Sequence, residues 1–206
     1  RNVLEIDPSN SLALLYLGMI ARESGHLLDS RRLVKKAKSI DPSNPEIENQ
    51  LGIIARIAKQ TKEAIRHFRY ALELDSKYVP AASNLANIYF EQSKFESARK
   101  LSREILRQNP EHKNSLTILA QSFFQDKRYE KAIKYHERIK FFFPFDLQNL
   151  LNLGAAYGKN RESLKAKQTY EHIIGIEPNS VKALHGLATT LSEAGEMDKA
   201  IKSPST

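Results

Sequence analysis

The six histidines are the side chains of this chain best suited to chemistry, since an imidazole can transfer a proton near neutral pH or bind a metal ion. None pairs with another histidine or with a carboxylate at a spacing that makes a convincing acid–base or metal site, and no glycine-rich phosphate loop is present. The chain has no cysteine, which excludes thiolate metal sites and cysteine nucleophiles. We therefore predict no enzyme activity, metal or cofactor in this segment. The histidines are His26, His67, His112, His136, His172 and His185.

Amides, rings and guanidinium groups at helical spacing suggest a different chemistry, the recognition of a polypeptide. Asn87 precedes Phe90 by three residues, and Gln121 precedes Phe124 by three, so each amide should neighbour a ring on one helix face. Such amides can satisfy backbone groups of a ligand while the rings cover its apolar side chains. The alternative is that both rings pack into the interhelical core. The predicted ligand-contact residues are Arg22, Asn49, Arg56, Asn84, Asn87, Phe90, Gln121 and Phe124.

A period of 34 residues positions these side chains. Each period ends with an amphipathic stretch whose last residue is in most cases an acid or an amide. A helix terminator follows that residue. Repetition at this length predicts a helical solenoid, in which each unit packs on its neighbours. The terminators are Pro8, Pro42, Ser76, Pro110, Pro144 and Pro178.

Small residues recur in two columns of this register, where helix backbones are expected to approach closely. A leucine precedes each member of the first column by one residue, which gives one apolar stripe per helix. The first column is Gly18, Gly52, Ala86, Ala120, Gly154 and Ala188, and the second is Ser30, Ala64, Ala98, Ala132, Ala166 and Ala200.

These columns, with stretches such as 63–72 and 150–157, make the chain resemble the tetratricopeptide repeat family. The resemblance implies an all-α, right-handed superhelical solenoid of antiparallel helix pairs, with five complete repeats and partial terminal repeats. We expect one solenoid over 1–206: the tail of a repeat at 1–8, five repeats over 9–178 and an incomplete sixth at 179–206, as a piece of a longer protein. The local departures from the pattern are Glu48 and Ser102 in apolar or aromatic slots, Ser76 in a proline slot and His136 in an aromatic slot.

The expected first helices cover 10–23, 45–58, 79–92, 113–126, 147–159 and 181–193. The second helices are expected at 28–40, 62–74, 95–108, 129–142 and 163–175, with a last one from about 197. Gly25 and Gly195 mark turns between paired helices.

The resemblance implies a protein-interaction scaffold that binds a peptide or helix of a partner in a concave groove formed by first helices. The alternative is a substrate-docking or regulatory arm of a larger enzyme, such as a transferase. Family members that bind chaperone tails carry a two-carboxylate clamp of Lys, Asn and Arg in the inner columns. The cationic half of that clamp is missing here, since Leu15, Met19 and Ser83 stand in those columns. Only Asn84 and Asn152 match the asparagine ladder of transferase-fused arrays.

The net charge of +8 is spread over second helices and interleaved with acids, so it favours an acidic protein partner or an anionic membrane surface over nucleic acid. No apolar run is long enough to span a membrane. A cytoplasmic location is favoured, although the composition is compatible with any compartment.

A run of rings, Phe141 to Phe143 and Phe145, surrounds one helix end. We expect Phe143, Phe145 or both to stay partly exposed as an apolar anchor for a partner or for self-association. The alternative is that they fill a gap beside the small residues Ala155 and Ala156. The terminal repeats, which lack a neighbour on one side, are a second surface at which self-association is expected.

Overall fold

The computed structural model describes residues 7–202, with side chains described as far as residue 195. This part of the chain contains eleven helices and no strand, and it divides into two compact units, one up to Gln108 and the other from Asn109. Unit 1 contains α2 (Ser11–Glu23), α3 (Leu27–Ile40), α4 (Pro45–Ile57), α5 (Thr61–Leu74), α6 (Val79–Glu91) and α7 (Phe95–Gln108). Unit 2 contains α8 (Lys113–Gln125), α9 (Tyr129–Phe142), α10 (Leu147–Lys159), α11 (Ser163–Ile176) and α12 (Val181–Lys202).

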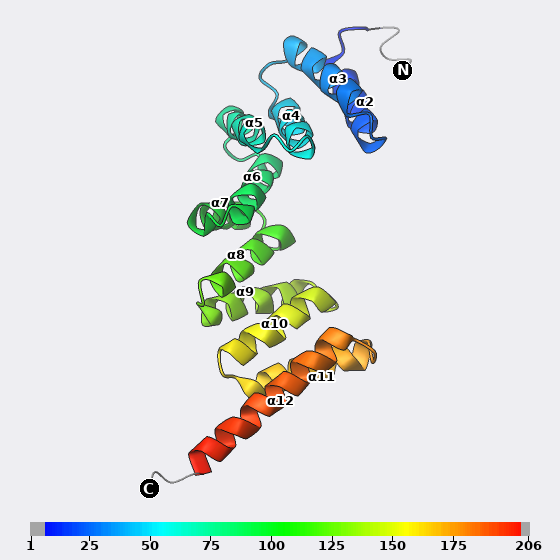
Figure 1. Cartoon of the computed structure of the whole chain (residues 1–206). Coiled ribbons are helices and arrows are strands. Elements are labelled where there is room, and N and C mark those ends of the chain that lie inside the picture. The colour runs from blue at the N-terminus through cyan, green and yellow to red at the C-terminus, as the bar shows by residue number, and fades with distance from the viewer. Residues whose placement is uncertain (1–6, 203–206) are drawn as a thin grey trace. The chain divides into compact units, whose positions relative to one another are not determined.

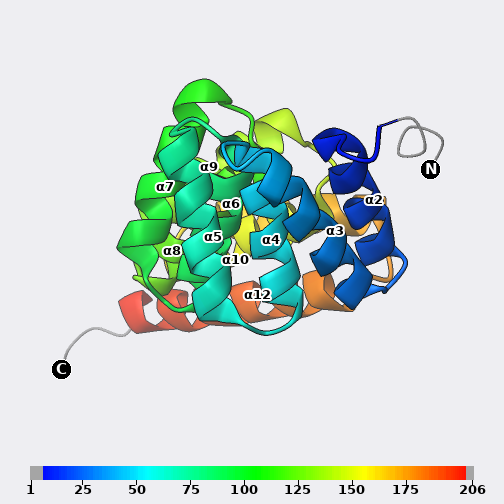
Figure 2. The same cartoon turned by 90° about the horizontal axis from the view of Figure 1, so that it is seen from above.

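Successive helices pack as pairs within each unit (Figure 1). In unit 1, α2 packs on α3, α4 on α5 and α6 on α7, while α3 also contacts α4 and α5 also contacts α6. Seen from above, α2 lies beside α3 and α4 beside α5 (Figure 2). In unit 2, α8 packs on α9 and α10 on α11, which contacts α12. The predicted all-α arrangement of helix pairs is confirmed, and the ten helices α2–α11 begin and end within one residue of the expected ranges.

Side-chain caps start several first helices at the second residue after the terminator. The Asn10 side chain accepts a hydrogen bond from the backbone N of Ala13 (2.9 Å), and Asp146 accepts one from the backbone N of Asn149 (3.1 Å). Asn44 caps α4 in the same way, with Pro45 in the first turn. Each cap satisfies a backbone donor that the helix cannot satisfy itself.

Every turn between paired first and second helices, from α2/α3 to α10/α11, contains one residue in the left-handed region. Only the first is glycine, Gly25 at φ +82°, and the residues at the same register are Lys59, Ser93, Lys127 and Arg161, at φ between 56° and 62°. The next backbone N–H closes the turn onto the helix, as His26 does on Ala21 O (2.8 Å). This is the helix ending that glycine favours most, and the other residues adopt it at some cost in strain.

The end of the chain differs from the prediction. We expected a turn at Gly195 and a new helix from about 197, whereas α12 continues through Gly195 to Lys202. A glycine inside a helix costs only about 1 kcal/mol relative to alanine. The stretch after Gly195 within α12 is about two turns long, too short to form a stable second helix by itself. The expected repeat tail at 1–8 falls mostly outside the described residues.

The small-residue columns are buried at helix crossings, as predicted, as far as the side chains are described, except that Ala188 on α12 is exposed; Ala200 lies outside the described side chains. A Cβ at Gly52 would lie 2.5 Å from a ring carbon of Phe68, and one at Gly154 would lie 2.7 Å from a ring carbon of Tyr170. Where the column holds Ala86 or Ala120, the residue 16 positions later is smaller than these rings, Ser102 or His136. The residue in the first small-residue column and the residue 16 positions later are therefore matched in size within these repeats.

His136 shows how one departure from the family pattern is accommodated. It occupies the aromatic slot with its side chain buried, and its Nδ1 donates to Asn149 Oδ1 (2.8 Å) while Asn149 Nδ2 donates back to the His136 carbonyl (3.0 Å). Burial lowers the pKa of His136, although the Asn149 hydrogen bond opposes this. The contacts give His136 a structural role in the core of unit 2.

Candidate functional site

Polar side chains link the three first helices of unit 1, with contacts from α2 to α4 and from α4 to α6. Arg22 on α2 donates from Nη1 to Gln50 Oε1 on α4 (2.6 Å), and Asn84 on α6 donates from Nδ2 to Asn49 Oδ1 on α4 (2.9 Å). Arg56 on α4 forms an ion pair with Glu91 on α6. We call the exposed side of these linked helices the first-helix surface, comprising α2, α4 and α6.

Asn49 and Asn84 have different roles on this surface. The Asn49 side chain is 3% exposed, so it holds Asn84 in place rather than reaching toward a ligand. Asn84, Asn87 and Phe90 are half-buried on α6, and Asn87 has interactions of its own. The predicted pair of Asn87 and Phe90 on α6 is therefore partly accessible, and it lies on the same helix as Asn84, which the buried Asn49 holds in place.

The two predicted aromatic contacts are half-buried and repeat the same local packing. The Phe90 ring lies 5.6 Å from the Phe95 ring, centroid to centroid, and the Phe124 ring lies 5.4 Å from the Tyr129 ring. Each pair spans the turn from a first to a second helix. Gln121 is half-buried on α8 with Phe124. The pair of Asn87 and Phe90 thus belongs to unit 1, and the pair of Gln121 and Phe124 belongs to unit 2.

The phenylalanine run after α9 contains both exposed and covered rings. Phe145 is 78% exposed and Phe141 is also exposed, whereas Phe143 is half-buried with the Lys113 ammonium 5.4 Å from its ring centroid. Lys113 also pairs with Asp146 (3.0 Å). Phe145 therefore has the exposure expected of an anchor, and binding through Phe143 and Phe145, like association through the terminal repeats, stays a prediction.

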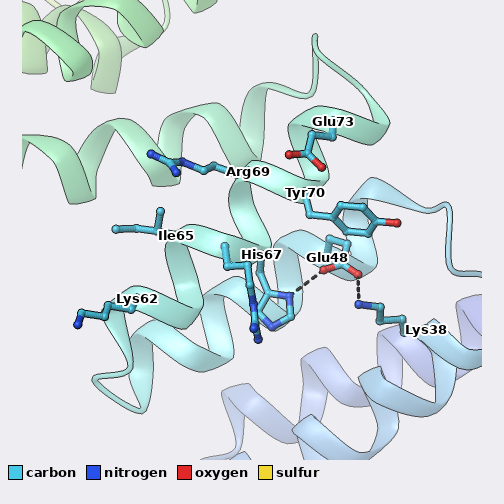
Figure 3. A pocket seen from close by; sticks show the side chains of 9 residues that line it. Lys38, Glu48, Lys62, Ile65, His67, Arg69, Tyr70 and Glu73 are labelled. Atoms are coloured by element: carbon cyan, nitrogen blue, oxygen red, sulfur yellow. Dashed lines mark hydrogen bonds and ion pairs between the residues drawn. The ribbon is translucent and has the colours of Figure 1, made fainter.

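A charged triad lies inside unit 1 where sibling repeats are apolar. Glu48 on α4 is 1% exposed; it forms an ion pair with Lys38 Nζ on α3 (2.6 Å) and accepts a hydrogen bond from His67 Nδ1 on α5 (2.8 Å). Figure 3 shows Lys38 and His67 pointing at this carboxylate from either side. The sequence marked Glu48 as a departure, but it did not identify its partners, because they lie on two other helices. Residues at the Glu48 register elsewhere are Leu14, Ala82, Leu116, Leu150 and Leu184.

Burial of Glu48 acts to raise its pKa, but the hydrogen bonds from His67 and Lys38, together with their charges, hold that pKa below its usual value of 4.5. The sequence showed no histidine spaced from a carboxylate so as to make a convincing acid–base or metal site; the structure places His67 beside Glu48 and 3.7 Å from Glu63, as ion pairs. Among side chains described up to residue 195, no group of three or more metal-ligating residues has a geometry that could hold a metal ion.

This pKa shift predicts how stability changes with pH. A carboxyl whose pKa is lowered in the folded state stabilises the fold above its unfolded pKa, and the contribution is lost as the pH falls through the folded pKa. The difference in unfolding free energy between the wild type and Glu48→Gln should therefore be greatest near pH 6–7 and shrink below about pH 4.5. Urea unfolding of both proteins at several pH values measures it. A difference that stays constant down to pH 3 would refute the assignment.

Comparisons with known proteins agree with this geometry. A family model described as tetratricopeptide repeat matches residues 147–180, and the model for subunit 3 of the anaphase-promoting complex, cyclosome, matches residues 58–139. Comparison with curated protein sequences gives no significant match. No helix of the described part of the chain is both long and apolar enough to cross a membrane.

Solved structures share the fold at low sequence identity. A tetratricopeptide repeat protein from Parabacteroides merdae is 20% identical, with a TM-score of 0.76 over 93% of this chain and 76% of that one. PilF of Pseudomonas aeruginosa is 21% identical, with a TM-score of 0.73 over 95% and 93% of the two chains. YrrB, described as a tetratricopeptide repeat protein with an unusual peptide-binding site, is 16% identical, with a TM-score of 0.74 over 89% and 95%.

The 34-residue register, the helix pairs, the matched repeat and the shared fold point to one conclusion. This chain has the fold of tetratricopeptide repeat proteins, and its residues 147–180 match one such repeat.

Proposed function

We propose that this chain is a protein-interaction scaffold that binds a peptide or helix of a partner protein on its first helices. The observation that carries the proposal is the set of polar links across α2, α4 and α6, at Arg22–Gln50, Asn49–Asn84 and Arg56–Glu91. These links hold guanidinium and amide groups at fixed positions on three consecutive helices. A surface whose side chains are already ordered loses less entropy when it binds.

The chemistry of the first-helix surface suits a polypeptide ligand. Asn84 and Asn87 can pair with backbone N–H and C=O groups, and the half-buried Phe90 ring can cover an apolar side chain. Arg22 and Arg56 can each add a charged contact to a ligand carboxylate. The fold relative YrrB, which is described as having a peptide-binding site, is consistent with this class of ligand.

The test uses peptides selected from a random 15-residue phage library on the wild-type chain. The affinity of the strongest peptide is then measured by fluorescence anisotropy for Arg56→Ala, Phe90→Ala and a control, Arg103→Ala. Arg56 and Arg103 are matched, since they are 39% and 42% exposed and each pairs with one glutamate, Glu91 or Glu96.

We expect Arg56→Ala and Phe90→Ala each to weaken binding by about tenfold, which is about 1.4 kcal/mol, and Arg103→Ala to change it by less than about twofold. Thermal unfolding of each variant confirms that the fold is kept. Equal affinities for all three variants and the wild type would place the ligand elsewhere and overturn the proposal.

A further inference from the structure

The Lys38–Glu48–His67 triad forms part of the wall of a cavity of about 530 Å³ on the second-helix side of unit 1. Its other lining residues come mostly from α5, and Figure 3 shows the triad at one side of the view and Lys62, Ile65 and Arg69 at the other. None of the residues predicted from sequence to contact a ligand lines this cavity. It is therefore a site separate from the first-helix surface.

The cavity wall carries an excess of positive charge. Lys38, Lys62, Arg66 and Arg69 face two carboxylates, Glu48 and Glu73, so the excess is two positive charges without counting His67. Glu48 is buried and already paired with Lys38 and His67, which leaves little negative charge to repel an anion. In the part of the chain with described side chains, Lys62 makes no ion pair, and Arg66 is 3.9 Å from its glutamate, Glu63.

Stability does not account for the triad. Two buried or half-buried charges cost desolvation energy, and replacing a buried ion pair with apolar residues of similar volume is often neutral or stabilising. Sibling repeats make that replacement, with leucine at the Glu48 register in Leu14, Leu116 and Leu150, all buried. A function that uses the charges explains why this repeat differs.

Unit 2 contains a cavity at the same register, three repeats later, with a volume of about 330 Å³. Its lining keeps Lys140 at the Lys38 position and also includes Lys165 and Glu137, but Leu150, Gln168 and Thr169 occupy the positions of Glu48, Arg66 and His67. The buried carboxylate with its paired lysine and histidine therefore distinguishes the cavity of unit 1 from this one.

We infer that the cavity of unit 1 binds an acidic peptide segment of a partner protein. Lys62 and Arg66 supply charge for its carboxylates, Lys38 and His67 are held in place by Glu48, and the Tyr70 ring, with Ile65, gives an apolar wall beside them. The Lys38 ammonium lies 5.5 Å from the Tyr70 ring centroid, so the ring also helps to hold this cation.

The test measures a fluorescein-labelled ten-residue peptide of Glu and Asp with one Tyr, by anisotropy at 50 and 200 mM salt. The control peptide replaces every acid with Gln or Asn. The variant Arg66→Glu is compared with Lys134→Glu, which has the same charge change on an exposed residue at the same repeat register but outside the described cavities.

We expect Arg66→Glu to weaken binding of the acidic peptide at least tenfold and Lys134→Glu to weaken it less than threefold, with weaker binding at the higher salt. Competition with inorganic phosphate tests whether a single anion is enough, and displacement only at tens of millimolar is the expected result. Equal losses in both variants would show that net charge alone attracts the peptide, and equal binding of the neutral peptide would show that carboxylates are not recognised. Either result overturns the inference, while the first-helix surface would remain untested by it.

Discussion

Replacing Phe68 with alanine is expected to lower the free energy of unfolding by about 3–5 kcal/mol, the largest effect of any single substitution considered for this chain. The Phe68 ring is fully buried in unit 1 and fills the space left by Gly52, where a Cβ would lie 2.5 Å from a ring carbon. Removing the ring leaves a cavity that the rigid helix backbones cannot close. Urea unfolding followed by circular dichroism measures the loss.

The substitution Gly52→Ala tests whether Gly52 and Phe68 are matched in size, as distinct from the loss of apolar area that Phe68→Ala causes. Gly52→Ala alone should destabilise the chain, because its Cβ displaces the ring, whereas in the Phe68→Ala background it should recover about 1 kcal/mol. The control is Gly158→Ala, since a Cβ at Gly158 meets no atom within 4 Å and the change should be slightly stabilising. Additive effects of Gly52→Ala and Phe68→Ala would show that the two positions are not matched.

Replacing Lys38 with leucine should cost about 2–3 kcal/mol, because it leaves the Glu48 carboxylate buried with only His67 beside it. This cost lies below the range of about 3–5 kcal/mol for breaking a fully buried pair, since the Lys38 side chain is 38% exposed. The triple variant Lys38→Leu, Glu48→Leu, His67→Leu, which restores apolar residues seen in sibling repeats, should be as stable as the wild type or more so.

Chemical denaturation of the single and triple variants tests this directly. A triple variant less stable than Lys38→Leu alone would mean that the triad stabilises the fold. That result would also remove the reason for assigning the triad to binding.

Much of the fold could be predicted because the 34-residue register repeats a local rule. Small residues, each preceded by a leucine, mark the helix faces that touch in every period, so all helices from α2 to α11 were placed within one residue of their ends. The register failed at the last helix, since Gly195 stands at the position of the turn glycine Gly25 but α12 continues through it to Lys202. The 34-residue spacing placed the turns at Lys59 and Arg161, but their left-handed backbone could not be predicted, because neither residue is a glycine.

The candidate site was less predictable because its contacts join residues on different helices. The columns identified Asn49 and Asn84 as one inner surface, but only the structure shows that the buried Asn49 supports Asn84. Glu48 was visible as a polar residue in an apolar slot, whereas its partners, 10 residues before it and 19 after it, depend on how α3 and α5 pack around α4.

The measurement that tests the central claim most directly is the pattern of backbone amide shifts in the nuclear magnetic resonance spectrum of the chain when the selected library peptide is added. If the scaffold binds its ligand as proposed, the largest changes fall on first helices, above all at Asn84, Asn87 and Phe90 on α6, with Arg22 and Arg56 beside them. Changes confined to the second helices α3, α5 and α7 would contradict the account.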